Sequence, residues 1–179
     1  FSHTHIRRVS VSSLLRTQFE WFYPLSEQHQ IQFKIDAPKE LYWNTDSVYF
    51  KKILANLISN AFKYTEDGGT VRISLHEEEN FLVLKVYNTG KGIEEADMQN
   101  IFDRYRILGT MDNDDNRQNT ARNGLGLFIC HSLVQSLGGR IDIESEVGQY
   151  AEFTVTLPFG IVEESSDDTI DEDIPVSLP

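Results

Sequence analysis

The sequence is poor in features that mark several classes of protein. Its single cysteine, Cys130, excludes an internal disulfide and favours a reducing compartment. No apolar run approaches the length of a membrane span, and no signal peptide is visible. The five histidines are scattered without metal-ligand spacing, and no basic patch suits nucleic acid. We therefore expect a domain that contacts neither membrane nor nucleic acid directly.

The charge is distributed unevenly along the chain. The net charge is −12, and residues 160–179 contain seven acids and no base. Without them, 21 acids face 16 bases, which is ordinary for a soluble domain. We expect residues 160–179 to be an acidic, flexible linker to a further domain, with a plain solubilising terminus as the alternative. A chain of 179 residues with 40% hydrophobic content can bury one core, which predicts one domain.

The hydrophobic pattern predicts a mixture of helices and strands. An amphipathic segment runs from Val11 to about His29, where Pro24 should kink or divide the helix. Thr45-Asp46-Ser47 offers N-cap side chains to a helix that contains Asn56, and Gly138-Gly139 ends a later helix. The predicted strands are 31–35, 41–43, 70–75, 81–87, 141–144 and 152–157, the last two joined around Gly148. The sequence thus predicts an α+β fold, a two-layer sandwich with a mixed sheet of about five strands and three main helices.

The helix after Ser47 carries polar residues within an apolar pattern. Asn56, Asn60 and Lys63 stand at i, i+4 and i+7, so they share one helix face beside an apolar stripe. Carboxamide oxygens suit a magnesium ion, and an ammonium group suits phosphate. The alternative is a solvated helix flank with incidental asparagines.

Three further motifs follow in order. Asn88-Thr89-Gly90-Lys91-Gly92 closes the strand 81–87, and Ile101-Phe102-Asp103-Arg104-Tyr105 ends a short helical segment. Gly124-Leu125-Gly126-Leu127 opens a helical run through Leu137. The polar segment 103–123 is too long for an ordinary connection, and a disordered insertion is the alternative to a functional loop.

The four motifs in this order resemble the catalytic, ATP-binding domain of sensor histidine kinases. That domain belongs to the superfamily of gyrase, heat-shock chaperone, histidine kinase and mismatch-repair ATPases. The resemblance covers roughly residues 10–159 and implies the Bergerat ATP-binding fold, with residues 103–123 as the ATP lid. It implies ATP and Mg²⁺ as cofactors, and transfer of the γ-phosphoryl group to a histidine.

The resemblance also assigns roles to single residues. Asn60 would coordinate Mg²⁺, with Asn56 as a less certain ligand, and Lys63 would neutralise phosphate; these three are the expected catalytic residues. Hydrolytic relatives have a water-activating Glu at the position of Asn56, whereas a carboxamide is nearly useless as a base. The nucleotide-binding residues that the resemblance implies are Asn60, Lys63, Tyr64, Asn88, Gly90, Gly92, Ile93, Phe102, Arg104, Arg122, Gly124, Leu125, Gly126, Leu127 and Thr154.

Several of these assignments have alternatives or depart from the family pattern. Tyr64 can equally be a core aromatic, and Thr154 can be an ordinary strand residue. The first glycine box usually begins with Asp, which accepts a hydrogen bond from the adenine amino group; here it begins with Asn88. A freely rotating carboxamide predicts weaker binding and relaxed selectivity between adenine and guanine. Arg122 or Arg117 of the lid could reach the γ-phosphate.

The phosphoacceptor motif of the family is missing. His3 is followed by Thr4 and not by an acid, so His3 and His5 are poor phosphoacceptors. Residues 1–9 are interpreted as the remnant of a preceding dimerisation and phosphoacceptor region, or as an artificial junction. The expected partners are that helical hairpin, on the same or a sister chain, and a downstream receiver domain followed by a helix-turn-helix domain.

The resemblance further predicts the cytoplasmic domain of a homodimeric sensor anchored in a bacterial inner membrane. A non-catalytic nucleotide-binding module is one alternative, which Asn88 favours. A related ATPase or serine kinase is another, which Asn56 disfavours.

Overall fold

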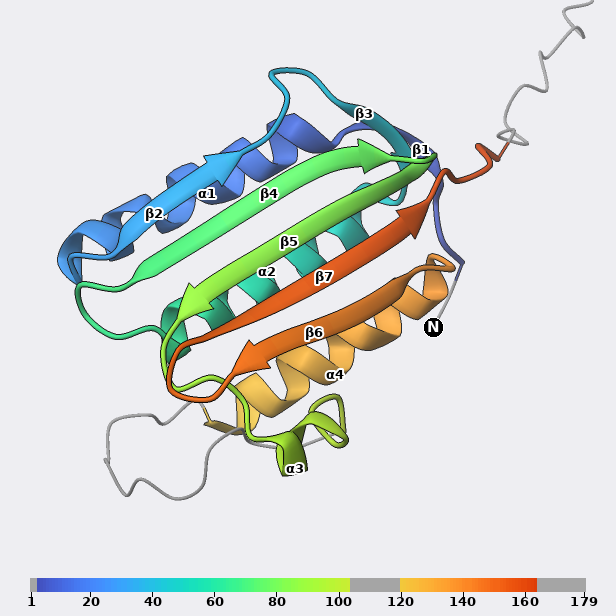
Figure 1. Cartoon of the computed structure of the whole chain (residues 1–179). Coiled ribbons are helices and arrows are strands. Elements are labelled where there is room, and N and C mark those ends of the chain that lie inside the picture. The colour runs from blue at the N-terminus through green and yellow to red at the C-terminus, as the bar shows by residue number, and fades with distance from the viewer. Residues whose placement is uncertain (1–2, 104–119, 164–179) are drawn as a thin grey trace, which may run out of the picture.

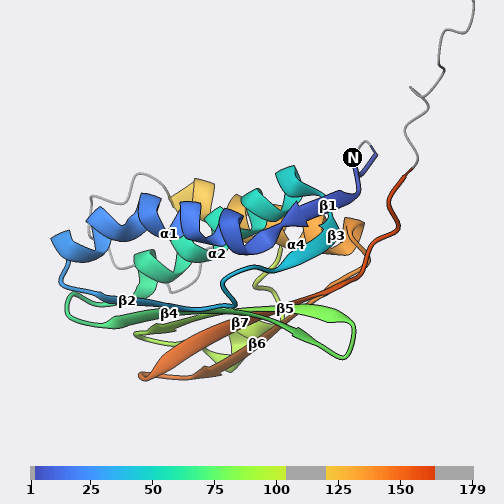
Figure 2. The ribbon, with the colours of Figure 1, turned by 90° about the horizontal axis from the view of Figure 1, so that it is seen from above.

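The computed structural model describes residues 3–103 and 120–163, with the backbone alone for residues 120–125. Three helices lie together on one face of a five-stranded sheet, and no helix of the described residues covers the other face (Figure 1 and Figure 2). This is the two-layer α+β sandwich predicted from the sequence, with its mixed five-stranded sheet and three main helices. Within the described residues, no helix is both long and apolar enough to cross a membrane.

The sheet has the strand order β2-β4-β5-β7-β6. Its strands are β2 (Gln32–Asp36), β4 (Thr70–Glu78), β5 (Phe81–Thr89), β6 (Arg140–Glu146) and β7 (Tyr150–Pro158). β2 and β4 are parallel and the other pairs are antiparallel, as expected of two hairpins and one crossover through a helix. The predicted strand near Trp43 is not in this sheet. It is β3 (Tyr42–Thr45), which pairs with β1 (Arg7–Ser10) in a separate ribbon.

The main helices are α1 (Val11–Gln28), α2 (Ser47–Tyr64) and α4 (Thr120–Ser136), and α3 (Glu95–Met98) is a single short turn. α1 is one helix that runs through Pro24, so of the two expected effects of proline, a kink or a division, the division does not occur. Tertiary packing holds its second half. The Phe22 ring stacks on Phe62 of α2 at 5.7 Å, and Phe19 packs on Phe33 of β2 at 4.4 Å. These contacts offset the hydrogen bond that proline removes.

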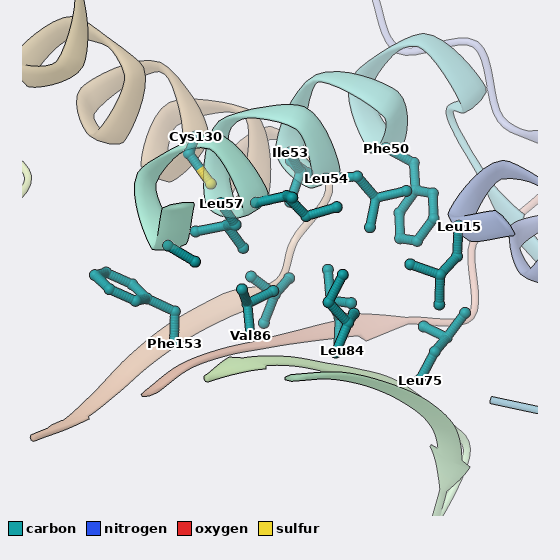
Figure 3. Close-up of a cluster of buried hydrophobic side chains, with 14 of the residues drawn as sticks. Leu15, Phe50, Ile53, Leu54, Leu57, Leu75, Leu84, Val86, Cys130 and Phe153 are labelled. Carbon is teal, nitrogen blue, oxygen red and sulfur yellow. The ribbon is translucent and has the colours of Figure 1, made fainter. Parts of the chain in front are cut away.

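The core lies between α2 and the sheet. Figure 3 shows Leu54 and Leu57 of α2 pointing toward Leu84 and Val86 of β5, with Phe153 of β7 beside them. In β7 every second residue is buried, so one face of the strand meets the helices. Each fully buried aliphatic side chain contributes about 1.5–3 kcal/mol, so this layer holds α2 firmly against β5.

The two ends of the described chain are bound to the same ribbon. The Gly160 N–H donates to the Asn44 carbonyl oxygen at 2.8 Å, and Asn44 Nδ2 donates to the Gly160 carbonyl oxygen at 3.1 Å. The His5 N–H donates to Asp46 Oδ2 at 2.8 Å. The structure therefore joins residues on both sides of the predicted boundaries 10 and 159 to the fold.

Candidate functional site

Helix α2 begins at a strong N-cap, as the sequence predicted. Asp46 Oδ1 accepts hydrogen bonds from the N–H groups of Val48 and Tyr49, both at 3.0 Å. The cap fixes the start of the helix, and the apolar stripe against β5 fixes its rotation. Together they determine where the polar face of α2 lies.

The carboxamides of the two asparagines of α2 are not used in hydrogen bonds within the described structure. Asn60 is 7% exposed, and Asn56 is half-buried. Among residues 3–103 and 120–163, no hydrogen bond is made by either carboxamide. The polar atoms of both carboxamides keep access to solvent, because neither residue has a fully buried side-chain atom that lacks a hydrogen bond. A ligand between α2 and its neighbours could therefore reach them without first breaking a bond within the described structure.

Lys63 and Tyr64 end the same helix. The Lys63 ammonium is buried and lies 5.1 Å from the centroid of the Tyr64 ring. A cation in the last turn also complements the negative end of the helix dipole, so Lys63 has a structural role beside any contact to phosphate. Tyr64 is half-buried, which fits a ring that borders a ligand as well as a partial core residue.

Asn88 lies on the helix-covered face of the sheet. Asn88 is two residues after the buried Val86 of β5, so both side chains lie on the same face of the strand. The residues paired with Asn88 on the neighbouring strands are Val71 of β4 and Ala151 of β7. The side chain is 3% exposed, and its Nδ2 donates to the Thr89 carbonyl oxygen at 2.9 Å. A carboxamide is thus buried at the end of an otherwise apolar strand face.

The first glycine box passes under the end of α2. A Cβ on Gly90 would collide with the Tyr64 carbonyl oxygen and would lie 3.5 Å from Asn88 Nδ2. Gly90 has φ +149° and Gly92 has φ +67°, backbone angles that residues with a side chain rarely adopt. A Cβ on Gly92 would lie 2.5 Å from the Glu146 carbonyl oxygen. The box therefore admits no side chain at either glycine, and it brings Asn88 close to the end of α2.

The β6–β7 hairpin holds this box from the other side. The Gly90 N–H donates to the Gln149 carbonyl oxygen at 3.1 Å, and the Gly148 N–H donates to the Lys91 carbonyl oxygen at 2.7 Å. The Ile93 N–H donates to Ser145 Oγ at 2.8 Å. Ile93, which the resemblance lists among the nucleotide contacts, is 7% exposed and belongs to the core. The support from Ser145 was not foreseen, because its partner is a backbone group distant in sequence.

α4 closes the site on the side of Asn56. A Cβ on Gly126 would lie 3.7 Å from Asn56 Oδ1, so the second glycine box faces the polar residues of α2. Leu127 is 2% exposed and packs in the core. Phe102 is half-buried and stacks on His131 of α4, with 4.8 Å between ring centroids. The residue that directly precedes the predicted lid is thus packed against α4.

The structure places Thr154 away from the other candidates. β7 alternates, and Thr154 is out of phase with the buried Ala151 and Phe153, so it lies on the uncovered face of the sheet. The β7 residue that borders Asn88 is Ala151. Arg104 and Arg117 lie outside the described residues. The side chains of Arg122 and Leu125 are not described either, and Gly124 is described by its backbone alone.

Two titratable groups near these elements have raised pKa values. Burial raises the pKa of the Cys130 thiol on α4 to about 12. A hydrogen bond from the Tyr150 hydroxyl to Glu144, 2.8 Å long, raises the pKa of Tyr150 to about 12. Both groups are protonated at neutral pH, and neither supplies a base. Within the described part of the chain, no cluster of three His, Cys, Asp or Glu side chains could bind a metal.

The fold and these motifs define a nucleotide-binding ATPase-type domain, and comparison with protein families agrees. Residues 45–161 match the family of histidine kinase-, DNA gyrase B- and HSP90-like ATPases. The chain belongs to this family, and within it resembles the sensor histidine kinases.

A sensor protein is among the relatives of this chain. The sensor protein SrrB of Staphylococcus aureus strain NCTC 8325 is 36% identical over 120 residues, which are 67% of this chain and 20% of SrrB. The chain thus spans about a fifth of the length of this relative.

Solved structures of other proteins share the fold. The catalytic domain of histidine kinase ThkA is 23% identical with a TM-score of 0.73, covering 86% of this chain and 95% of that one. Full-length ShkA in complex with AMPPNP is 25% identical with a TM-score of 0.75, covering 91% and 33%.

Proposed function

We propose that this domain binds Mg-ATP between α2, the first glycine box and α4, and transfers the γ-phosphoryl group to a histidine of an adjoining helical hairpin. One observation carries the proposal above all. Asn60 is buried on α2 without a hydrogen bond from its carboxamide to any described residue, and it shares a helix face with Asn56 and Lys63. Family membership makes ATP the expected ligand of such a face.

The chain's own residues would bind and orient the nucleotide. The donor set fits Mg²⁺, because Asn60 and Asn56 offer neutral oxygens and ATP itself supplies the charged ones. When bound, Mg²⁺ neutralises charge on the phosphates. Lys63 would contribute a positive charge from a buried position. Gly90 and Gly92 would hold the first glycine box close to the end of α2 and to the β6–β7 hairpin, since a Cβ on either would meet a backbone carbonyl oxygen.

Asn56 favours phosphoryl transfer over hydrolysis. A carboxamide does not accept a proton at neutral pH, so it cannot activate water. The base or acceptor must then come from outside the domain, which suits an imidazole presented by another segment. Catalysis by this chain would consist of positioning and charge neutralisation.

The partners follow from the same proposal. The phosphoacceptor hairpin, on the same or a sister chain, would meet the γ-phosphate beside α4. A receiver domain would take the phosphoryl group, as in a hybrid phosphorelay sensor with a cytoplasmic kinase region. The proposal is supported by the acidic segment 160–179 and by the sensor relatives. A non-catalytic nucleotide-binding module is the second candidate, because Asn88 stands where the family has an acid.

Labelled ATP separates these candidates. Incubated with γ-labelled ATP, the domain alone should neither label itself nor hydrolyse ATP quickly, because it offers neither an acceptor nor a base. Supplying the helical hairpin encoded next to this domain in its full-length protein should yield an acid-labile phosphohistidine on the hairpin. Binding of ATP without any transfer would support the non-catalytic module. Stable label on His3 or His5 would contradict our interpretation of the N-terminal segment.

A further inference from the structure

The sheet face that no described helix covers carries its charges in two separate halves. One row of side chains crosses the five strands from β2 to β6 in the order Lys34, Arg72, Tyr87, Glu152 and Glu144. These residues alternate with core-facing residues of their strands, so all five lie on this face. Both bases thus lie on β2 and β4, both acids lie on β7 and β6, and the tyrosine lies between them on β5.

Contacts within the chain leave this separation of charge in place. Lys34 is paired with Arg72, and Glu144 is paired with Glu152, and like charges at such neighbouring positions repel each other. Among the described residues, none of these four side chains forms an ion pair. The fold alone gives no reason to gather charges of one sign, whereas a charged partner does.

Two tyrosines form the centre of the same face. The rings of Tyr87 and Tyr150 are stacked, with 5.5 Å between their centroids. The Arg72 guanidinium lies 4.2 Å from the centroid of the Tyr87 ring, and the Tyr150 hydroxyl donates to Glu144 at 2.8 Å. Aromatic rings surrounded by charged groups are typical of the contact surfaces between proteins.

The arrangement of charge is self-complementary about the central strand. β5 is the third of the five strands, so a two-fold axis that runs parallel to β5 along this face places β2 and β4 of one copy over β6 and β7 of another. Lys34 of each copy then meets Glu144 of the other, and Arg72 meets Glu152. An axis perpendicular to the strands would place base over base and acid over acid, so the charges select the first arrangement.

We infer that this face binds a second copy of the chain, in a symmetric dimer whose ion pairs join the β2–β4 half of one copy to the β6–β7 half of the other. Sheets that pack face to face lie about 10 Å apart, a distance that long charged side chains and tyrosines bridge. Five strands about 4.8 Å apart give a face of roughly 500–600 Å². An interface of that size is at the low end for specific complexes, so the dimer is weak and sensitive to salt.

The next row of the sheet is compatible with this dimer. Asp36 of one copy would face Asp142 of the other, but each acid has a partner in its own chain. Asp36 Oδ2 lies 3.4 Å from His76 Nε2, and Asp142 Oδ2 lies 2.7 Å from Arg140 Nε. Lys85 of β5 would approach its own copy near the axis, where its flexible stem lets the two ammonium groups separate.

Separate reversal of the two halves tests the inference. Lys34→Glu/Arg72→Glu makes all four charges of the row acidic, and Glu144→Lys/Glu152→Lys makes all four basic. We expect each variant to dimerise at least roughly tenfold more weakly than the wild type. An equimolar mixture of the two variants should form a heterodimer at least as tightly as the wild type forms its homodimer. Sedimentation equilibrium up to about 1 mM protein measures these affinities.

A matched control separates the local effect from that of net charge. Lys51→Glu/Lys52→Glu changes the net charge as much as Lys34→Glu/Arg72→Glu does, at exposed positions of α2 in the helical layer. It should leave the dimer affinity of the wild type unchanged. The wild-type dimer should also be weaker at about 0.3 M salt than at about 0.02 M, because salt screens exposed ion pairs.

Cross-linking gives a second measurement that does not depend on charge reversal. Lys85→Cys places a thiol on β5 beside the proposed axis, whereas Lys34→Cys places one on β2, about four strand spacings or roughly 19 Å across the face from its own copy. Cys130 is buried and does not compete. A short bismaleimide should therefore link Lys85→Cys into a covalent dimer and leave Lys34→Cys monomeric.

Three results would overturn the inference: a wild type that stays monomeric up to about 1 mM, reversed variants that dimerise as tightly as the wild type, or a mixture of them that fails to associate. If circular dichroism shows that the reversed variants do not fold, the cross-linking decides. Equal cross-linking of the two thiol variants would then overturn the inference, and selective linking of Lys85→Cys would support it. The inference is independent of the proposed function, because α2 and Asn60 lie on the other side of the sheet.

Discussion

At the scale of single residues, Asn60 combines burial with an unused hydrogen-bonding capacity. Asn60→Ala should remove the Mg²⁺-dependent part of the ATP affinity, by about tenfold or more, since one metal ligand is lost. It should leave the free energy of unfolding unchanged or higher, because the described structure loses no hydrogen bond with it. Titration of ATP with and without Mg²⁺, beside a urea unfolding curve, measures both effects. An unchanged dependence on Mg²⁺ would exclude the metal role.

Cys130 supplies a prediction about pH. Burial raises the pKa of its thiol to about 12 from an ordinary value of 9.0. The folded state therefore keeps a proton that the unfolded state loses above a pH of 9.0, so stability should fall as pH rises from there toward about 12. In mildly alkaline buffer, the thiol should resist iodoacetamide in the folded protein and react in urea. Rapid labelling without denaturant would contradict the burial. Cys130→Ala, which has no thiol, controls for other groups that titrate in this range.

Sequence patterns predict the positions of some single side chains and not of others. Helical periodicity placed Asn56, Asn60 and Lys63 on one face, because the pitch of about 3.6 residues per turn is fixed by the backbone. Thr154 lies on the opposite sheet face from Asn88, because strand alternation reverses with each residue and family likeness does not fix the phase. The orientation of the Asn88 carboxamide depends on its hydrogen bond to the Thr89 carbonyl oxygen, a backbone contact that a sequence motif does not encode.

At the scale of elements, the first glycine box is fixed between α2 and the β6–β7 hairpin. Gly90→Ala should destabilise the domain and abolish nucleotide binding, because the new Cβ collides with the Tyr64 carbonyl oxygen. Gly148→Ala is the matched control: it has φ +79°, but a Cβ there meets nothing within 4 Å. Both changes carry a conformational cost of about 1–2 kcal/mol, and only Gly90→Ala adds a collision. Thermal melts and ATP titrations compare them; equal losses would show that the close approach to α2 is unimportant.

Elements with a strong local signal were predicted well. The hairpin β4–β5, the N-cap of α2 and the end of α4 at Gly138 all follow from turn and cap residues. The ribbon β1–β3 was missed, because its strands are short and separated by α1, so only long-range pairing reveals it. Pro24 does not divide α1, since aromatic packing on both Phe33 and Phe62 outweighs the local preference of proline.

At the scale of the whole molecule, both described ends of the chain are bound to one ribbon. Gly160 pairs with Asn44, a Cβ on Gly160 would lie 2.7 Å from Ile6 Cγ2, and Arg7 Nη1 donates to the Glu163 carbonyl oxygen at 3.4 Å. Two ends of the described chain that lie so close can be joined by a short linker without distorting the fold. Nucleotide would meanwhile bind at the opposite end of β5, where Asn88 lies.

This proximity makes the domain suited to circular permutation. A short glycine-serine linker from Glu163 to His3, with new ends opened at the exposed turn Glu79-Asn80, would keep every strand pair of the sheet. We expect the permutant to fold and to bind Mg-ATP with nearly wild-type affinity, as measured by calorimetry. Loss of binding in a folded permutant would show that continuity between β4 and β5 matters to the site. A permutant that binds ATP would offer a biosensor scaffold, since fluorescent proteins fused at the new ends would lie far from the nucleotide.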